Sequence, residues 1–276
     1  MRNNERRLGP QTTKGDDAPV AAVSQMAFAV PTEFVELPSE GEFYPKDHPL
    51  YKQKTVEIKF MTAKEEDILS SQALLKNGLA IDRFLESILV QDIDPKSLFV
   101  GDRGAILIAA RISGYGTEYK VEYPCPACAT NNEIEFNLQE VTINKKALDN
   151  NFLKENNLVF NEETSTFDFT LPTTGVEVGL RLLDGHGDTE NLAKQNQDSL
   201  ITSMLSMFLI KVNGSEDPEY IQSFIEVLPA KDSRFIRNLY PKLVPSVRLM
   251  HYFSCKQCYH QKDVEVPLTA EFFWPE

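Results

Sequence analysis

Histidine, tryptophan and cysteine are all scarce in this sequence of 276 residues, which has four histidines, one tryptophan and four cysteines. The histidines, at positions 48, 186, 251 and 260, form no pattern with a serine or cysteine nucleophile. The sequence also lacks a G-x-G-x-x-G, a Walker loop, a nucleophile elbow and an H-E-x-x-H motif. We therefore expect no enzyme, no catalytic or cofactor-binding residues and no small-molecule substrate.

Basic side chains are outnumbered, with 28 Lys and Arg against 41 Asp and Glu and a formal net charge of −13. Sequence-independent binding to DNA or RNA depends on basic side chains that neutralise phosphates, so this charge argues against a general nucleic-acid binder. Long apolar runs are also missing, since none approaches the roughly 20 residues that span a bilayer. We expect a soluble globular protein with no membrane contact, because its composition is close to the average for that class.

Residues 1–32 carry several basic side chains and little apolar content before residue 18. This composition predicts a flexible N-terminal arm, either a plain tail or a segment that becomes ordered on a partner. The apolar run at 18–31 resembles the hydrophobic part of a signal peptide, but it follows Asp16 and Asp17 and is interrupted by polar residues. We therefore expect no secretion.

The cysteines form two C-x-x-C pairs, CPAC and CKQC, each between two strand-like runs. The runs around the two pairs have equal offsets: Ile134 follows the first cysteine of its pair by the same number of residues as Val264 does. Two such pairs supply the four thiolates of a closed tetrahedral zinc site. The predicted ligands are Cys125, Cys128, Cys255 and Cys258.

Three other readings of the cysteines were weighed. A redox dithiol needs its C-x-x-C to open a helix, whereas both pairs here lead into strand-like runs. Two local disulfides need an oxidising compartment, and four unlinked buried thiols would leave the matched hairpins unexplained. We therefore predict one structural Zn²⁺ per chain, with no open position for catalysis because protein ligands fill all four places.

The cysteine hairpins end two longer segments that share one order of elements. The first segment has a strand-like run at 55–60 and helical patterns at 62–78, 79–90 and 101–114, and the second has a strand-like run at 175–185 and helical patterns at 188–214, 217–228 and 231–240. Thr62 and Glu65 have the spacing of a capping box, and Asp102 is expected to cap the third helix. The pattern predicts an α+β fold with internally duplicated strand, three-helix and β-hairpin units, joined by a zinc-ribbon-like clasp of four cysteines.

The expected organisation is an arm at 1–32, a first half at 33–140 with the CPAC turn and a second half at 141–276 with the CKQC turn. We expect residues 33–276 to form one compact unit.

Four further segments were considered. The turn DGHGDTE (184–190) resembles a metal or acid/base site with Asp184, His186 and Asp188, but in the duplicated frame it joins a strand to a helix that Asp188 caps. Helical spacing assigns Met204, Met207 and Phe208 to the core, with a partner groove as the alternative. The loop at 39–51 either covers the core or docks a partner. The ending EFFWPE (271–276), with Trp274, either packs onto the domain or contacts another subunit.

The sequence contains the runs LPSEGEFYP (37–45), MTAKEEDIL (61–69) and GDRGAILIAARI (101–112), followed by CPAC. In these runs it resembles the baseplate hub assembly proteins of T-even-like contractile-tailed bacteriophages. The resemblance is densest over residues 35–140. It implies a hub subunit or assembly chaperone that binds other phage baseplate hub proteins and carries no catalytic residues. It also implies a location in the host cytoplasm during assembly and then in the virion tail baseplate. The alternative is a zinc-ribbon module that binds nucleic acid.

Overall fold

The computed structural model describes residues 30–144, 150–185, 200–265 and 270–273. The chain divides into two units, Met1–Val30 and Pro31–Glu276. The arm predicted for residues 1–32 therefore falls almost entirely outside the described residues. Among the helices of the described segments, none is both long and apolar enough to cross a membrane.

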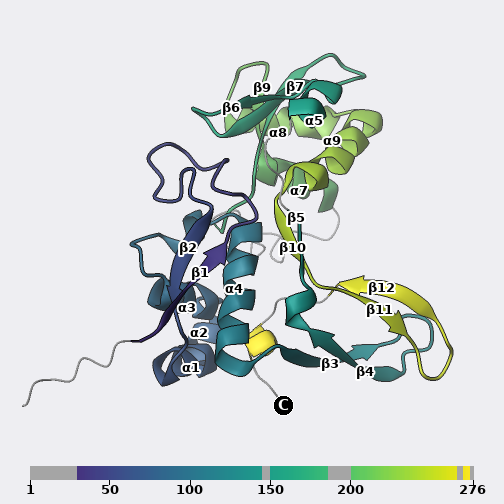
Figure 1. Ribbon diagram of the computed structural model, residues 1–276. Coiled ribbons are helices and arrows are strands. Elements are labelled where there is room, and N and C mark those ends of the chain that lie inside the picture. The colour runs from purple at the N-terminus through teal and green to yellow at the C-terminus, as the bar shows by residue number, and fades with distance from the viewer. Residues whose placement is uncertain (1–29, 145–149, 186–199, 266–269, 274–276) are drawn as a thin grey trace, which may run out of the picture. The chain divides into compact units, whose positions relative to one another are not determined.

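The first part of the second unit begins with a strand pair, continues with helices and ends in a strand hairpin (Figure 1). Its elements are β1 (Thr32–Glu36), β2 (Thr55–Lys59), α1 (Ala63–Ser70), α2 (Gln72–Lys76), α3 (Ala80–Ile88), the 3₁₀ turn η1 (Pro95–Ser97), α4 (Val100–Tyr115), β3 (Glu118–Pro124), β4 (Asn131–Asn137) and the 3₁₀ turn η2 (Leu138–Glu140).

The remainder starts with short strands, continues with helices and ends in a second hairpin. Its elements are β5 (Thr142–Asn144), α5 (Asn150–Glu155), β6 (Val159–Asn161), β7 (Thr166–Thr170), β8 (Glu177–Arg181), α7 (Leu200–Phe208), β9 (Leu209–Val212), α8 (Pro218–Val227), α9 (Ala230–Leu243), β10 (Ser246–Arg248), β11 (Met250–Ser254), β12 (Gln261–Glu265) and the 3₁₀ turn η4 (Ala270–Phe273).

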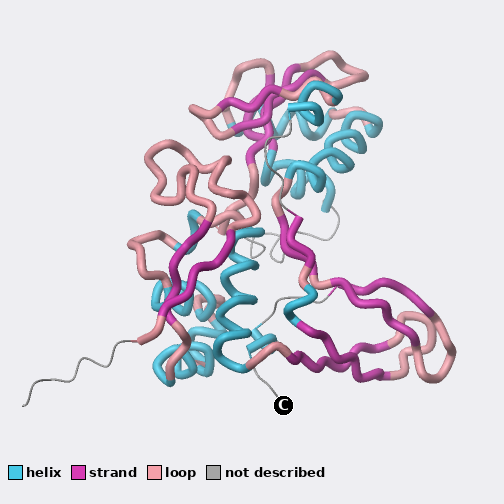
Figure 2. Tube along the Cα trace, in the orientation of Figure 1, coloured by secondary structure: helices cyan, strands magenta, loops and turns pink. Residues whose placement is uncertain are grey.

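The strands form one antiparallel four-stranded sheet, in the order β6-β7-β8-β9, and four two-stranded antiparallel pairs. Three pairs, β1-β2, β3-β4 and β11-β12, are hairpins or close neighbours in sequence, whereas β5 pairs with the distant β10. Figure 2 shows helices and strands as separate segments along the chain. This mixture confirms the predicted α+β class.

Two predicted helices differ from the structure. The helix expected over 62–78 is divided at Ser71, whose backbone is extended, although its capping box at Thr62 and Glu65 is present. The helix expected over 188–214 ends at Phe208, and β9 follows it at once as a partner of β8. Leu209 and Val212 become buried in that sheet, so tertiary burial overrides the helical spacing there. The sequence also gave no signal for β6 or β7.

The loop at 39–51 covers the core and is held to the start of α4 by Asp102. The Ser39 N–H donates to Asp102 Oδ1 at 2.9 Å, and the Tyr44 hydroxyl donates to Asp102 Oδ2 at 2.8 Å. Asp102 is fully buried, as are Phe43 and Tyr44 to within a few percent. Phe43 and Tyr44 are therefore part of the core, whereas residues 45–47 and 49 of the same loop are exposed, so docking of a partner by this loop stays a prediction.

Asp102 is not the helix cap that the sequence predicted. Phe99 holds the N-cap position of α4, and Asp102 lies in the first turn with its carboxylate directed at the loop. A carboxylate at this place also benefits from the positive end of the helix dipole.

The second half uses the same arrangement with different residues. Asp232, in the first turn of α9 and fully buried, accepts hydrogen bonds from the Thr173 and Thr174 N–H groups, each at 2.9 Å. Thr173 follows a Leu-Pro pair as Ser39 does, and Asp232 precedes Cys255 by the same number of residues as Asp102 precedes Cys125. Both turns also contain a glycine in the left-handed region, Gly41 at φ 72° and Gly175 at φ 69°. Each half thus fixes a strand-end turn to a helix with one buried aspartate.

A buried arginine fixes the C-terminal part of the described chain. Arg111, on α4, is 1% exposed and donates to the carbonyl oxygens of Phe272 at 3.0 Å, Gly116 at 3.0 Å and Glu118 at 3.2 Å. Burial lowers its pKa from the ordinary value, but the three carbonyls satisfy the guanidinium. Phe272 and Phe273 are buried against Tyr119 and Phe84, so this ending packs within the chain. Trp274 lies outside the described residues.

Two of the three α7 positions assigned to the core, Phe208 and Met204, lie in it or pack against it, whereas Met207 is half-buried and outside that cluster. Phe208 is buried and stacks on Tyr240 with 4.1 Å between ring centroids, while Met204 packs partly buried against the core. His186 and Asp188 of the DGHGDTE turn lie outside the described residues, so its acid/base reading stays a prediction.

The two buried aspartates predict opposite responses to pH. Burial opposes ionisation of Asp232, but its hydrogen bonds outweigh this and lower its pKa below the ordinary 3.8. The stabilisation is therefore present above that value and is lost as the pH falls through the lowered pKa. Asp232→Asn should reduce the free energy of unfolding by about 2 kcal/mol at neutral pH. The difference from the unmodified protein should shrink below about pH 4, as measured by urea denaturation.

Asp102→Asn is the matched control. Burial raises the pKa of Asp102 in spite of its hydrogen bonds, so its stabilisation is full in acid and declines as the pH rises through the raised pKa. The stability deficit of Asp102→Asn should thus be larger in acid than at neutral pH. Parallel pH profiles for the two variants would contradict this account.

Candidate metal centre

The two cysteine turns have the same local structure because their hairpins have the same register. Val121 pairs with Ile134 and His251 with Val264, each partner lying 130 positions further along the chain. The Cys125 N–H donates to the Thr130 carbonyl at 2.9 Å, as the Cys255 N–H does to the His260 carbonyl at 2.9 Å.

Each turn also needs one residue with a left-handed backbone after its second cysteine. Ala129 has φ 58° and Tyr259 has φ 56°. Their N–H groups close the turns by donating to the Cys125 and Cys255 carbonyls at 2.8 and 3.1 Å. The four thiols are therefore presented by two equivalent backbone loops.

The structure brings all four predicted cysteines together. Their sulfur atoms lie within 4.8 Å of one another, and the pairs Cys125–Cys258 and Cys128–Cys255 are each separated by 3.6 Å. A tetrahedral Zn²⁺ with bonds of about 2.3 Å requires sulfurs about 3.8 Å apart. Such a cluster could hold a metal ion. Among the described residues it is the one group of three or more histidine, cysteine or acidic side chains with this property.

The alternatives to a metal fit the geometry less well. All four cysteines are free, and 3.6 Å is far longer than a disulfide bond of about 2.05 Å. Both turns lead into strands, β4 and β12, so neither has the helix N-terminus that activates a redox dithiol. Cys125 and Cys255 are buried while Cys128 and Cys258 are exposed, which does not suit four inert core thiols.

The thiols compete for ionisation. The backbone N–H of Cys258, with that of Gln257, lowers the pKa of Cys255 to about 6. The backbone N–H of His260 favours the Cys258 thiolate, but the neighbouring sulfurs outweigh it and raise the pKa of Cys258 to about 12. Four thiolates this close repel one another, and a divalent cation among them would remove the conflict.

Asn132 ties the two cysteine turns together, a role that no motif in the sequence indicated. Its side-chain oxygen accepts from the Lys256 N–H at 2.9 Å, and its Nδ2 donates to the Thr130 carbonyl at 2.7 Å and lies 3.7 Å from Cys255 Sγ. Asn132 is 3% exposed, whereas its counterpart Lys262 is exposed. One hairpin thus orients a cysteine of the other.

Aromatic contacts extend the junction between the hairpins beyond the sulfurs. Tyr123 meets its own counterpart Phe253 edge to face, with 5.0 Å between centroids, and Phe136 meets His251 at 4.8 Å. The two 3.6 Å sulfur contacts exchange with each other under the same 130-residue shift. These relations describe a local twofold pseudo-symmetry. His251 and His260 are not among the clustered ligand atoms, as expected.

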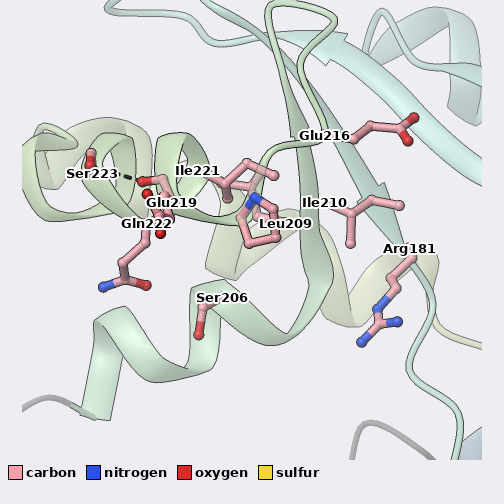
Figure 3. Close-up of a pocket in the computed structure, with 10 residues that line it drawn as sticks. Arg181, Ser206, Leu209, Ile210, Glu216, Glu219, Ile221, Gln222 and Ser223 are labelled. Atoms are coloured by element: carbon pink, nitrogen blue, oxygen red, sulfur yellow. Dashed lines mark hydrogen bonds between the residues drawn. The ribbon is translucent and has the colours of Figure 1, made fainter.

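A larger cavity lies elsewhere, between α7, α8 and β9, and has a volume of about 690 Å³ (Figure 3). Its hydroxyls are used within helices: Ser206 donates to the Ser203 carbonyl and Ser223 to the Glu219 carbonyl, each at 2.8 Å. Arg181 donates to the Met207 carbonyl. The lining residues contain no cysteine or histidine, so no nucleophile and base are paired there.

Comparison with known proteins places this geometry in a family. The family model described as T4 bacteriophage base plate protein matches residues 31–274. A search of curated proteins finds no match, and neither does a search of solved structures. The match spans both cysteine turns, and membership of a baseplate family implies interactions with other phage proteins and association with the virion tail. The chain belongs to the family of T4 bacteriophage base plate proteins.

Proposed function

We propose that this protein is a non-enzymatic hub subunit or assembly chaperone of the phage baseplate and that it binds other hub proteins in the host cytoplasm during assembly. The family match carries this proposal, because it covers nearly the whole of the unit Pro31–Glu276. The runs at 37–45 and 101–112, which carry the resemblance to hub assembly proteins, meet through Ser39 and Asp102.

The four cysteines are proposed to hold one structural Zn²⁺ per chain. Cys125, Cys128, Cys255 and Cys258 supply sulfur ligands near tetrahedral separations, and they fill every position of such a site. When bound, the ion would neutralise the thiolates and join the two hairpins. Closing a loop of this length limits the unfolded chain, so binding at this site adds to the stability of the folded state.

The two halves are proposed to descend from one duplicated unit, with residues 33–140 and 141–276 as its copies. The matched hairpin registers, the paired buried aspartates and the reciprocal sulfur contacts support this. The β1-β2 pair, which flanks the Ser39 turn, corresponds to β7-β8, which flanks the Thr173 turn, so the copies would differ in the added strands β6 and β9.

The alternative of a nucleic-acid-binding module gains no support from the hairpin surfaces. The solvent-facing side of β3 and β4 exposes Glu118, Glu122, Glu133 and Glu135 with a single Lys120. Such a face repels phosphates, which basic side chains have to neutralise.

The hub proposal predicts a defect at one stage of assembly. Deleting the gene from its phage should yield tails without complete baseplate hubs, and a tagged copy should purify with hub proteins from infected cells. Mass spectrometry of finished particles distinguishes a subunit, which remains, from a chaperone, which leaves. The proposal would be refuted if phage that lack the gene still made complete hubs and the protein were absent from tails and assembly intermediates of the unmodified phage.

The shared metal site predicts equal effects from the two halves. Elemental analysis of the purified protein should give one zinc per chain. Cys125→Ser and Cys255→Ser should each lower Tm by more than about 5 °C and to the same extent, because each removes one ligand of the same ion. The unmodified protein treated with a chelator should show a similar decrease. No zinc, or two per chain, would count against a shared site.

Asn132 is predicted to increase zinc affinity by orienting Cys255. Asn132→Asp places a carboxylate near the Cys255 sulfur and removes the Nδ2 donor, so zinc affinity should fall by about 10- to 100-fold. Zinc transfer to a competing chelator measures this. Lys262→Asp, at the matching exposed position of the second hairpin, is the control and should change the affinity little. Equal losses in both variants would indicate a general charge effect.

A further inference from the structure

A small cleft lies where the bases of the two cysteine hairpins meet. It has a volume of about 330 Å³ and is lined by β3, β4, η2 and β11. Glu118, Glu135 and Glu140 contribute carboxylates, while Phe136 and Met250 contribute apolar surface. The cleft therefore combines negative charge with an apolar wall at the junction of the two halves.

No lysine or arginine lines the cleft, and the nearest basic residue in the hairpin is Lys120, which lies opposite Glu135 without forming an ion pair with it. Glu118, Glu135 and Glu140 are all exposed, and none forms an ion pair with a residue that the structure describes. Like charges gathered beside a low-dielectric wall raise the local concentration of cations. The electrostatics of the cleft thus favour a positively charged occupant.

The apolar wall favours a cationic side chain over a bare metal ion as the occupant of the cleft. The Phe136 side chain is 5% exposed and is fixed by its contact with the His251 ring, while Met250 remains 48% exposed at the edge of the cleft. Arginine and lysine carry a charged head on an apolar stem, and arginine can bind carboxylates in pairs. A bare metal ion has no apolar stem to contact Phe136 and Met250. An arginine side chain can contact the apolar wall with its stem and the carboxylates with its guanidinium.

The two hairpins provide an internal comparison for the surface beside the cleft. Positions that hold Lys120 and Glu122 in β3 hold Met250 and Tyr252 in β11, although the registers are the same. Tyr252 is 59% exposed. At this place in the hairpin the first copy shows charged residues facing solvent, whereas the second shows a methionine and a tyrosine, which are enriched at protein interfaces.

We propose that the cleft, with Met250 and Tyr252 at its edge, is a docking site for a basic segment of another protein, whose arginine side chain enters between Glu118, Glu135 and Glu140. The inference rests on the proposed function in taking the occupant to be a protein. Asp263 and Glu265, which lie opposite Tyr252 and Met250 in the hairpin, extend the acidic rim toward such a segment.

The experiment uses the full-length zinc-loaded protein with methyl-labelled methionine and a short glycine peptide that contains one arginine. Addition of the peptide should shift the Met250 methyl signal in NMR spectra in a saturable way. The same peptide with citrulline, a neutral analogue of arginine, should bind at least tenfold more weakly. Binding should also weaken as salt is added, because the carboxylates are exposed.

Two double variants separate the cleft from the general charge of the hairpin. Glu118→Gln/Glu135→Gln should weaken peptide binding at least tenfold. Glu122→Gln/Glu133→Gln removes the same charge from the same face nearer the cysteines and should change binding less than twofold. Met250→Lys brings the residue of the first hairpin into the cleft and should block the peptide, as followed by the His251 ring signal.

Equal binding of the citrulline peptide, equal effects of the two double variants, or an unshifted Met250 signal would overturn the proposal. Saturable shifts with Mg²⁺ or Ca²⁺ and none with the arginine peptide would reassign the cleft to a cation and overturn it too. These titrations do not depend on the location of the protein in the phage. If this protein binds the arginine peptide but takes no part in hub assembly, the proposed function is refuted and this inference stands. If it is confirmed as a hub protein but does not bind the peptide, this inference is refuted and the proposed function stands.

Discussion

Four sulfur atoms join parts of the chain that 126 residues separate, between Cys128 and Cys255. The other contacts between the two hairpins depend on this junction. Asn132 reaches the second turn only because the turns are adjacent, and Tyr123 meets Phe253 for the same reason. The hairpins are two-stranded, and such pairs are marginal alone. The contacts between the two hairpins therefore stabilise both of them.

In each half, a second interaction fixes the helix that precedes the hairpin. A buried aspartate at the start of a helix holds the preceding strand-end turn. The first hairpin follows α4 directly, and the second follows α9 after the short strand β10. The distance along the chain from Asp102 to Cys125 equals that from Asp232 to Cys255, so the same helix start precedes both pairs of sulfurs. The two halves differ outside this frame, in the strands β6 and β9 and in the exposed faces of the hairpins.

Patterns that depend on local chemistry predicted much of this. The equal offsets around the two cysteine pairs predicted that the four cysteines lie together, and the mixture of strand-like and helical patterns predicted the α+β class. Strand β9 was missed because its burial comes from β8, which lies far away in sequence. The role of Tyr44 and Asp102 was missed because a loop that looks polar and aromatic gives no sign that its carboxylate partner lies on a helix 58 residues later. Asn132 was missed because its partner belongs to the other hairpin.

The contact between Arg111 and Phe272 spans 161 residues. During synthesis α4 leaves the ribosome long before the carbonyl that its arginine needs, and Cys125 and Cys128 likewise precede their partners. Gly116 and Glu118 supply two of the three acceptors of Arg111 from nearby in sequence, whereas Phe272 supplies the third from near the end of the described residues. An unsatisfied polar group is costly to bury. The buried environment of Arg111 is therefore complete only when residues 270–273 are in place.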